Sequence, residues 1–347
     1  MKSLLLTLDY ELYGNGSGNV FSHIIEPTEK ILKVLKEHKT HITFFFEVVE
    51  YWKLKEEWEK GNDMGYKENP IIAIENQIRN AYKEGHDFQL HLHPQWVDAK
   101  WENGTWKVDF DNWRLGGYNK EGEFSLTNLI QKGKDTLESI IFPIDENYRC
   151  VALRAGGYNI QPSKEIVKVM KTLGLTVDSS IYPGGLEKGT LSQYDYSSIP
   201  KDLGMWYCAE NFENIINQKS DIIELPIVAF PIIRIFKYLS FDKIMSLLKN
   251  KNSAKEAFIS KTGGNRSTLF SKIKYFFQKE WQTWDYCLFS TCLHKQYIKN
   301  IKLQKERDVF VLVGHPKSFT SDKGLCYLLT HTLNYDKITF TQYLKSI

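Results

Sequence analysis

The stretch that decides the fold is IIAIENQIRNAYKEGHDFQLHLHPQW, residues 71–96. Its first part, residues 71–84, places apolar side chains at helical spacing and is followed by Gly85, a residue that commonly ends a helix. The apolar run at 88–92 then has the length of a buried strand. A helix that leads directly into a buried strand predicts one unit of an α/β fold.

The same alternation continues in both directions along the chain. Further strands are predicted at 4–8, 42–46, 150–153, 175–178, 222–225 and 310–313, with a short last one at 338–340. Helices are predicted at 26–36, 53–60 and 126–141. Seven or eight parallel strands predict a distorted or incomplete parallel (β/α) barrel. We expect one domain over residues 1–347, with insertions at about 96–122 and 227–308, and we expect the second insertion to be mainly helical.

Composition argues against several classes of protein. A net charge of +3 over 347 residues is too small to indicate nucleic-acid binding. The five cysteines are scattered and form no CxxC pair, which supports neither a zinc ribbon nor a disulfide framework. We interpret the N-terminal segment as a strand rather than an export signal, and no stretch approaches the ~20 apolar residues of a membrane span. These features predict a cytoplasmic protein without a transmembrane segment.

One segment is strongly basic. The window 249–279 holds eight Lys or Arg and a single acid, Glu256, so its net charge is +7. Apolar residues recur at helical spacing within it, at positions 269, 273, 276 and 277. The pattern favours a solvated helix whose apolar face packs on the core. The alternative is peripheral contact with a membrane surface or an anionic carrier.

Ionisable side chains follow several predicted strands, where α/β barrels gather their catalytic groups. Asp9 and Glu11 are two residues apart and can therefore face one site, and the same holds for His91 and His93. Two imidazoles on one face are typical of a metal site. The two carboxylates suit one metal ligand and one general base.

Three other strand ends also carry polar groups. Arg154 can pair with a carboxylate and keep it ionised, and the following Gly157 and Tyr158 can offer backbone N–H groups to an oxyanion. Asp178 and His315 end two further strands. An Asp–His pair from different strands would orient the imidazole and raise its pKa, as a general acid requires.

Four tryptophans lie in the first predicted insertion: Trp96, Trp101, Trp106 and Trp113. Their rings could stack on sugars, and we expect Trp96 to contact substrate. Packing inside the insertion is the alternative interpretation.

Taken in order, these clusters resemble the five motifs of the polysaccharide deacetylase family (carbohydrate esterase family four, the NodB-homology fold). The matching segments are LTLDYE at 6–11, TFFF at 43–46, GHD at 85–87 followed by a histidine at 91, RAGGY at 154–158, DSS at 178–180, IELP at 223–226 and VGHP at 313–316. The resemblance spans residues 4 to about 316 and indicates a divergent, cytoplasmic subgroup.

The resemblance implies a role for each catalytic candidate. Asp9 would be the catalytic base and Arg154 would tune it. His315 would be the general acid and Asp178 would tune it. These roles belong to a hydrolase that acts on amide bonds.

The resemblance also implies a divalent metal ion, with Glu11 and His91 as ligands. Zinc is the expected ion, with cobalt, nickel, iron and manganese as alternatives. The family's second histidine stands four residues after the first, where this chain has Gln95, so His93 is the available substitute. Glu11 replaces the more usual aspartate, and Gly156 stands where the family has a proline.

The expected function is therefore metal-dependent N-deacetylation of an amino-sugar-containing glycan or glycan precursor. Two alternatives remain: a hydrolase of a small non-sugar amide on the same fold, and a catalytically silent carbohydrate-binding homologue.

Overall fold

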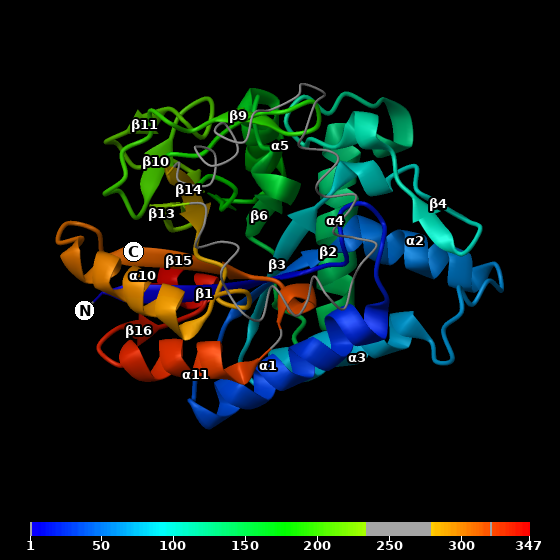
Figure 1. Cartoon of the computed structure of the whole chain (residues 1–347). Helices are drawn as coiled ribbons and strands as arrows, with labels where there is room; N and C mark the ends of the chain where they lie inside the picture. The colour runs from blue at the N-terminus through cyan, green and yellow to red at the C-terminus, as the bar shows by residue number, and fades with distance from the viewer. Residues whose placement is uncertain (1, 234–278, 320) are drawn as a thin grey trace, which may run out of the picture.

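A computed structural model describes residues 2–233, 279–319 and 321–347. Its centre is a curled, mostly parallel sheet in the order β11-β10-β12-β7-β6-β3-β2-β1-β15, with β16 also paired to β1 (Figure 1). The parallel strands are β1 (Ser3–Tyr10), β2 (Thr43–Glu47), β3 (Asp87–Leu92), β6 (Ala152–Ala155), β7 (Val177–Asp178), β12 (Ile223–Glu224), β15 (Val309–Gly314) and β16 (Asp336–Lys337). The antiparallel strands β10 (Trp206–Cys208) and β11 (Ile215–Ile216) extend one edge.

The two ends of the parallel array meet. Ile227, just after β12, forms a parallel bridge with Val311 of β15, and the Val228 N–H donates to the Val311 carbonyl at 2.8 Å. The strands are buried on both faces, as expected of a parallel sheet covered by helices. The predicted distorted (β/α) barrel is therefore confirmed.

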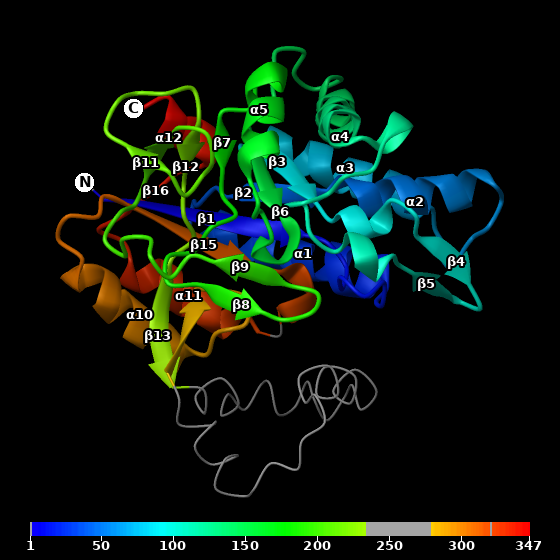
Figure 2. The same cartoon turned by 90° about the horizontal axis from the view of Figure 1, so that it is seen from above.

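Helices surround the sheet on the outside (Figures 1 and 2). They are α1 (Glu26–Glu37), α2 (Val48–Glu59), α3 (Pro70–Lys83), α4 (Leu126–Ile141), α5 (Lys164–Leu173), α10 (Thr291–Leu303), α11 (Asp322–His331) and α12 (Phe340–Leu344). They pack against one another around the sheet: α10 on α11, α11 on α1, α3 on α4, and α4 on α5. The helix in the deciding stretch starts one residue before its prediction because Asn69 caps it and Pro70 occupies its first position.

Several short strands and helical turns lie outside the central sheet. The first predicted insertion holds the hairpin β4 (Lys100–Glu102) and β5 (Thr105–Lys107), which lies beside α2 in both views (Figures 1 and 2). A second hairpin joins β8 (Leu186–Lys188) and β9 (Gln193–Asp195), and β13 (Ala229–Ile233) pairs with β14 (Lys279–Thr283). Single turns of 3-10 or π helix occur at η1 (Phe21–Ile25), η2 (Pro94–Trp96), η3 (Phe110–Asn112), η4 (Gly122–Phe124), η5 (Gly156–Tyr158) and η6 (Pro316–Ser318).

One prediction of secondary structure was wrong, and another was wrong in part. No strand occurs at 338–340; β16 ends at Lys337, and Thr339 and Gln342 form a capping box that starts α12 instead. In the region 227–308, predicted to be mainly helical, the described residues form the strands β13 and β14 as well as the helix α10, and residues 234–278 lie outside the described part of the chain. The basic window 249–279 lies outside the described residues except for Lys279. Among the described helices, none is both long and apolar enough to cross a membrane.

Candidate metal and catalytic centre

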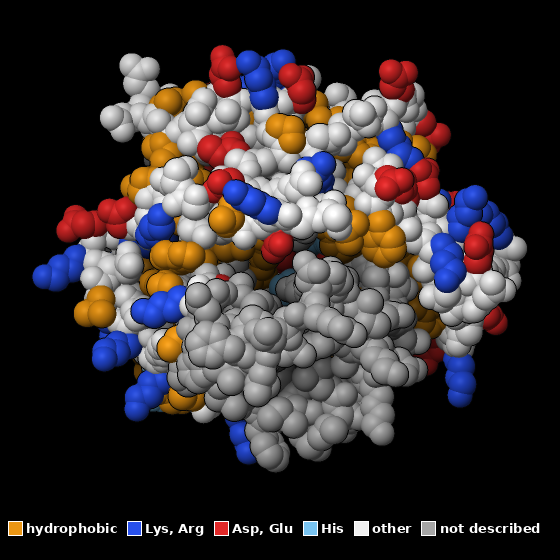
Figure 3. Space-filling view, turned by 45° about the horizontal axis from the view of Figure 1, so that its top comes forward, with side chains coloured by type: hydrophobic (Ala, Val, Ile, Leu, Met, Phe, Trp, Pro, Cys, Tyr) orange, Lys and Arg blue, Asp and Glu red, His pale blue; other side chains and the backbone are white. Residues whose placement is uncertain are grey.

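Six predicted side chains meet at the carboxyl ends of the parallel strands: Asp9, Glu11, His91, His93, Arg154 and His315. Asp9 lies in β1 and Glu11 just beyond it, while His91 of β3 pairs in register with Arg154 of β6. His315 directly follows β15. Parallel strands bring their carboxyl ends to one edge, so residues far apart in the chain become neighbours there. Figure 3 shows histidine and acidic side chains close together on one face of the molecule.

Three buried side chains form a candidate metal site. The Nε2 atoms of His91 and His93 are 3.2 Å apart, and Glu11 Oε2 lies 3.5 Å from the first and 2.7 Å from the second. Two ligand atoms about 2.1 Å from a tetrahedral ion would be about 3.4 Å apart. Two of the three separations match this value, and only the Glu11–His93 pair would have to open. The donor set therefore fits a divalent ion.

The surroundings favour the charge states of Glu11 and His93 that a metal ligand needs. Burial alone would raise the pKa of Glu11, but Lys317 and His93 lower it well below its usual value. The Lys317 ammonium holds Glu11 Oε1 at 2.8 Å and leaves Oε2 on the histidine side. Burial lowers the pKa of His93, which favours the neutral imidazole. His91 Nδ1 lies 2.9 Å from the Arg154 carbonyl oxygen, an interaction that fixes Nδ1–H and leaves Nε2 as the ligand atom.

Arg154 forms an ion pair with Asp9. Its Nη1 donates to Asp9 Oδ1 at 2.5 Å and to Thr7 Oγ1 at 2.8 Å, and its Nε and Nη2 donate to Ser179. The guanidinium also lies over the Phe45 ring, 3.9 Å from its centroid. Arg154 and Asp9 are both buried, so this ion pair is well shielded from solvent.

His315 lies across from Asp9, but its partner is not the one predicted. Its Nε2 is 3.6 Å from Asp9 Oδ2, and its Nδ1 is 2.8 Å from Asp285 Oδ2. Burial alone would lower the pKa of His315, but the carboxylates of Asp285 and Asp9 raise it above its usual value. The prediction that Asp178 tunes His315 was therefore wrong, and Asp285 occupies that position.

Asp178 supports the strand ends instead. Its carboxylate accepts hydrogen bonds from the Ser180 N–H and hydroxyl. Burial raises the pKa of Asp178 and, together with the Asp178 charge, raises that of Glu224 well above its usual value. Two buried carboxyl groups that share a site cannot both ionise easily, so this pair favours a shared proton.

Asp285 was missed because it lies inside the region predicted to be helical. In the structure it forms a parallel bridge with Val313 of β15, and the flanking Trp284 and Tyr286 exchange backbone hydrogen bonds with the same residue. The segment is therefore strand-like and ends beside His315. The available signal was a single acid within the apolar and aromatic run 284–289.

The predicted substrate contacts are only partly at this centre. Gly157 and Tyr158 follow Arg154, and both adopt left-handed backbone conformations, with φ of 56° and 65°. Gly157 is exposed. Trp96, in contrast, is only 1% exposed and packs against Trp106, so its predicted contact with substrate was wrong.

Trp113, from the same insertion, lies beside this centre, where Trp96 was expected. Its ring centroid lies 6.4 Å from that of His93, and its indole N–H donates to Ser192 Oγ at 3.1 Å. It stacks with Phe110, whose side chain is 43% exposed. The two rings form an aromatic surface at the edge of the centre, and sequence reasoning could not separate them from the packed tryptophans of the same insertion.

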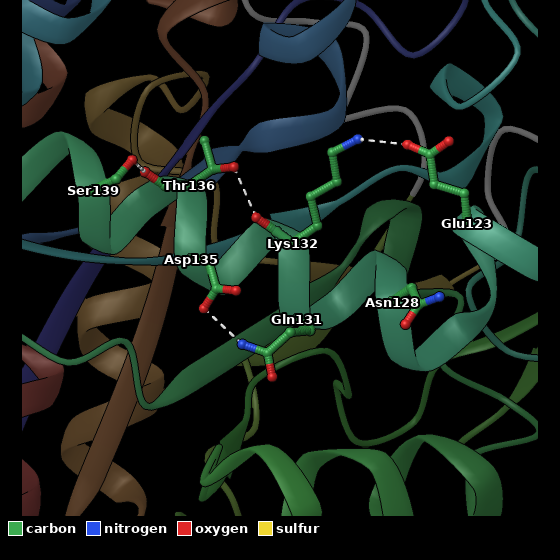
Figure 4. A pocket seen from close by; sticks show the side chains of 7 residues that line it. All are labelled: Glu123, Asn128, Gln131, Lys132, Asp135, Thr136 and Ser139. Carbon is green, nitrogen blue, oxygen red and sulfur yellow. Dashed lines mark hydrogen bonds and ion pairs between the residues drawn. The ribbon is translucent and has the colours of Figure 1, made fainter.

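A separate hollow along α4 has no ionisable cluster of this kind. Its side chains bond to one another, with Gln131 to Asp135 at 2.6 Å and Lys132 to Glu123 at 3.3 Å. Figure 4 shows that they come from one helix and its approach: Glu123, Asn128, Gln131, Lys132, Asp135, Thr136 and Ser139. This is an ordinary helix surface rather than a second centre.

No family model and no curated protein matches the chain. Similar solved structures include a Mycobacterium smegmatis protein assigned to the polysaccharide deacetylases (12% identity, 100% of this chain and 90% of that one, TM-score 0.44). A polysaccharide deacetylase from Bacillus cereus is also similar (12% identity, 98% and 92%, TM-score 0.38). A CE4 family pseudoenzyme from Bacillus anthracis matches about half of each chain (14% identity, 51% and 42%, TM-score 0.27). Since these TM-scores are below 0.5, the function must be argued from the centre itself.

Proposed function

We propose that this protein hydrolyses the N-acyl group of an amino sugar, with a divalent ion held by Glu11, His91 and His93. One observation carries the proposal. Beside the two histidines and Glu11, His315 Nε2 lies 3.6 Å from Asp9 and 3.7 Å from Glu11. A ligand set, a base and an acid therefore share one site, which is what amide hydrolysis requires.

A divalent ion in this site would polarise the acyl carbonyl and lower the pKa of the attacking water. The two-histidine, one-carboxylate set is typical of catalytic zinc, and cobalt, nickel, iron or manganese are the alternatives. The chain contributes the arrangement of its ligands. Lys317 keeps one oxygen of Glu11 engaged, and the Arg154 carbonyl holds the His91 ring in position.

Asp9 would act as the general base. Arg154 binds its Oδ1, so Oδ2 is the oxygen left to take a proton from water. Arg154 is in turn fixed by Thr7 and Ser179, so the guanidinium that binds the base cannot move away without breaking several hydrogen bonds.

His315 would act as the general acid. The carboxylates of Asp285 and Asp9 raise its pKa, which favours the protonated imidazolium, and Asp285 holds Nδ1–H. The proton on Nε2, on the side of Asp9 and Glu11, is then the one available to the leaving amine. After hydrolysis the amine has gained this proton, and Asp9 has gained the proton from water.

The remaining groups would position the substrate. A backbone N–H of Gly157 or Tyr158 would hold the developing oxyanion, where one donor is worth roughly 10²–10³ in rate. The half-buried Trp113 lies beside His93, and the exposed Phe110 stacks on it. Their ring faces favour a sugar over a compact non-sugar amide.

Acetate release from N-acetylglucosamine oligomers tests this proposal. Zinc-reconstituted protein is expected to release acetate, and Asp9→Asn is expected to lose about 10²–10⁴ of the rate because the base is removed. Asp135→Asn, an exposed change on α4, is the matched control. Unimpaired hydrolysis by Asp9→Asn would refute the assignment. If the protein hydrolyses a cyclic imide but releases no acetate from the sugar oligomers, its substrate is a small non-sugar amide instead.

A further inference from the structure

The imidazole of His93 lies flat on Gly156. A Cβ built at Gly156 would be 2.5 Å from both Cε1 and Nδ1 of that ring and 2.6 Å from Cδ2. Because three ring atoms lie at nearly the same distance, the face of the ring covers the glycine. Side-chain carbons essentially never approach other heavy atoms to less than 3.0 Å, so any residue other than glycine would displace the ring.

The His93 ring is also enclosed on its other sides. Its Nε2 lies 2.7 Å from Glu11 Oε2, its Nδ1 lies 2.8 Å from Gln95 Nε2, and the His91 ring stands perpendicular to it at 4.8 Å between centroids. His93 is only 5% exposed. A ring pushed off Gly156 therefore has no free space and must lose at least one of these contacts.

The backbone itself does not require glycine here. Gly156 lies outside the left-handed region, unlike Gly157, whose φ is 56°. Alanine could adopt the same backbone conformation without strain. The need for glycine at this position therefore comes from the ring above it.

We propose that Gly156 is a positioning residue for the metal centre, because its missing side chain is what lets His93 present Nε2 beside His91. The inference rests on the proposed function's metal ion. The proposal connects two features that lie apart in the sequence: the histidine two residues after the first ligand, and the glycine that follows Ala155 after Arg154. Gln95, four residues after His91, contacts Nδ1 of the His93 ring, the nitrogen that does not face Glu11 and His91.

Zinc affinity, measured by competition with a chromophoric chelator, tests the inference. Gly156→Ala is expected to weaken zinc binding about 10- to 100-fold, as changes to groups that orient ligands commonly do. In a His93→Ala background the same substitution should cause no further loss, because the ring it displaces is gone. The control is Gly189→Ala, where a Cβ would meet nothing closer than 3.4 Å and φ is not left-handed.

Each outcome separates the possibilities. Equal zinc affinity of Gly156→Ala and the unmodified protein would overturn the inference. So would an equal loss of zinc affinity when Gly156→Ala is made in the unmodified protein and in the His93→Ala variant. If Gly156→Ala fails to fold, the double variant with His93→Ala should fold again, and failure of both would overturn it. Absence of zinc binding by the unmodified protein would overturn the inference and the proposed function together. Zinc binding that depends on Gly156, without acetate release, would refute only the proposed function.

Discussion

Glu50 is expected to make the stability of the metal-free protein depend on pH. It lies on α2, is 3% exposed, and accepts a hydrogen bond from the Leu12 N–H at 2.9 Å. Burial raises its pKa from 4.5 to about 8; the Glu11 charge adds to this, while the Leu12 hydrogen bond and Lys317 oppose it. An acid with a raised pKa binds its proton more tightly in the folded state. Its contribution to stability is therefore complete below pH 4.5 and is lost as the pH rises through 8.

The pKa difference sets the size of the effect. A rise from 4.5 to about 8, at 1.36 kcal/mol per pKa unit, corresponds to about 5 kcal/mol over the whole range. Between pH 5 and pH 8 the expected loss is about 3–4 kcal/mol, an order-of-magnitude figure that is large against a typical domain stability of 5–15 kcal/mol.

Urea unfolding in the presence of a chelator measures this. Glu50→Gln keeps an oxygen for the Leu12 N–H but cannot ionise, so its unfolding free energy should fall by about 3–4 kcal/mol less than that of the unmodified protein between pH 5 and pH 8. Glu59→Gln, whose carboxyl is exposed on the same helix, is the control and should follow the unmodified protein. Parallel pH curves for Glu50→Gln and the unmodified protein would refute the reasoning.

Three further predictions concern the centre. Asp285→Asn removes the charge that raises the pKa of His315, so the alkaline limb of kcat/KM should move to lower pH and the rate should fall about 10²–10⁴-fold in a pH–rate profile. Trp113→Ala should raise KM for sugar oligomers about 2- to 10-fold, the equivalent of one aromatic contact, in steady-state kinetics. Arg154→Met leaves Asp9 buried without its partner and should lower the unfolding free energy by about 3–5 kcal/mol in urea titrations at neutral pH.

Each of these has a contrary result. An unshifted pH profile for Asp285→Asn would mean that the contact does not tune His315. Phe142→Ala, a change at a 62% exposed side chain, is the control for Trp113, and equal effects on KM would remove the case for an aromatic sugar surface. An Arg154→Met variant as stable as the unmodified protein would show that the ion pair between Arg154 and Asp9 does not stabilise the fold.

The sequence predicts the barrel and most of the centre because both follow from short-range patterns. Strand-length apolar runs define the parallel strands, and polar residues just after them must meet at one edge of the sheet. The spacing of two between Asp9 and Glu11, and between His91 and His93, then places each pair on one side. These features depend on neighbours in the chain and are visible without the fold.

The features that were missed depend on contacts distant in sequence. Asp285 reaches His315 only because its segment lies along β15, which no local pattern indicates. Trp96 and Trp113 belong to the same aromatic insertion, and only its packing buries the first and leaves the second half-exposed. The space above Gly156 is a property of the assembled site for the same reason.

The metal ion is the claim on which the mechanism depends, and anomalous diffraction from zinc-soaked crystals tests it most directly. The account predicts one strong anomalous peak per chain, bonded to Glu11 Oε2 and to the Nε2 atoms of His91 and His93, that disappears in crystals of His93→Ala. A peak that excludes His93, or crystals of active protein with no peak at this site, would contradict it.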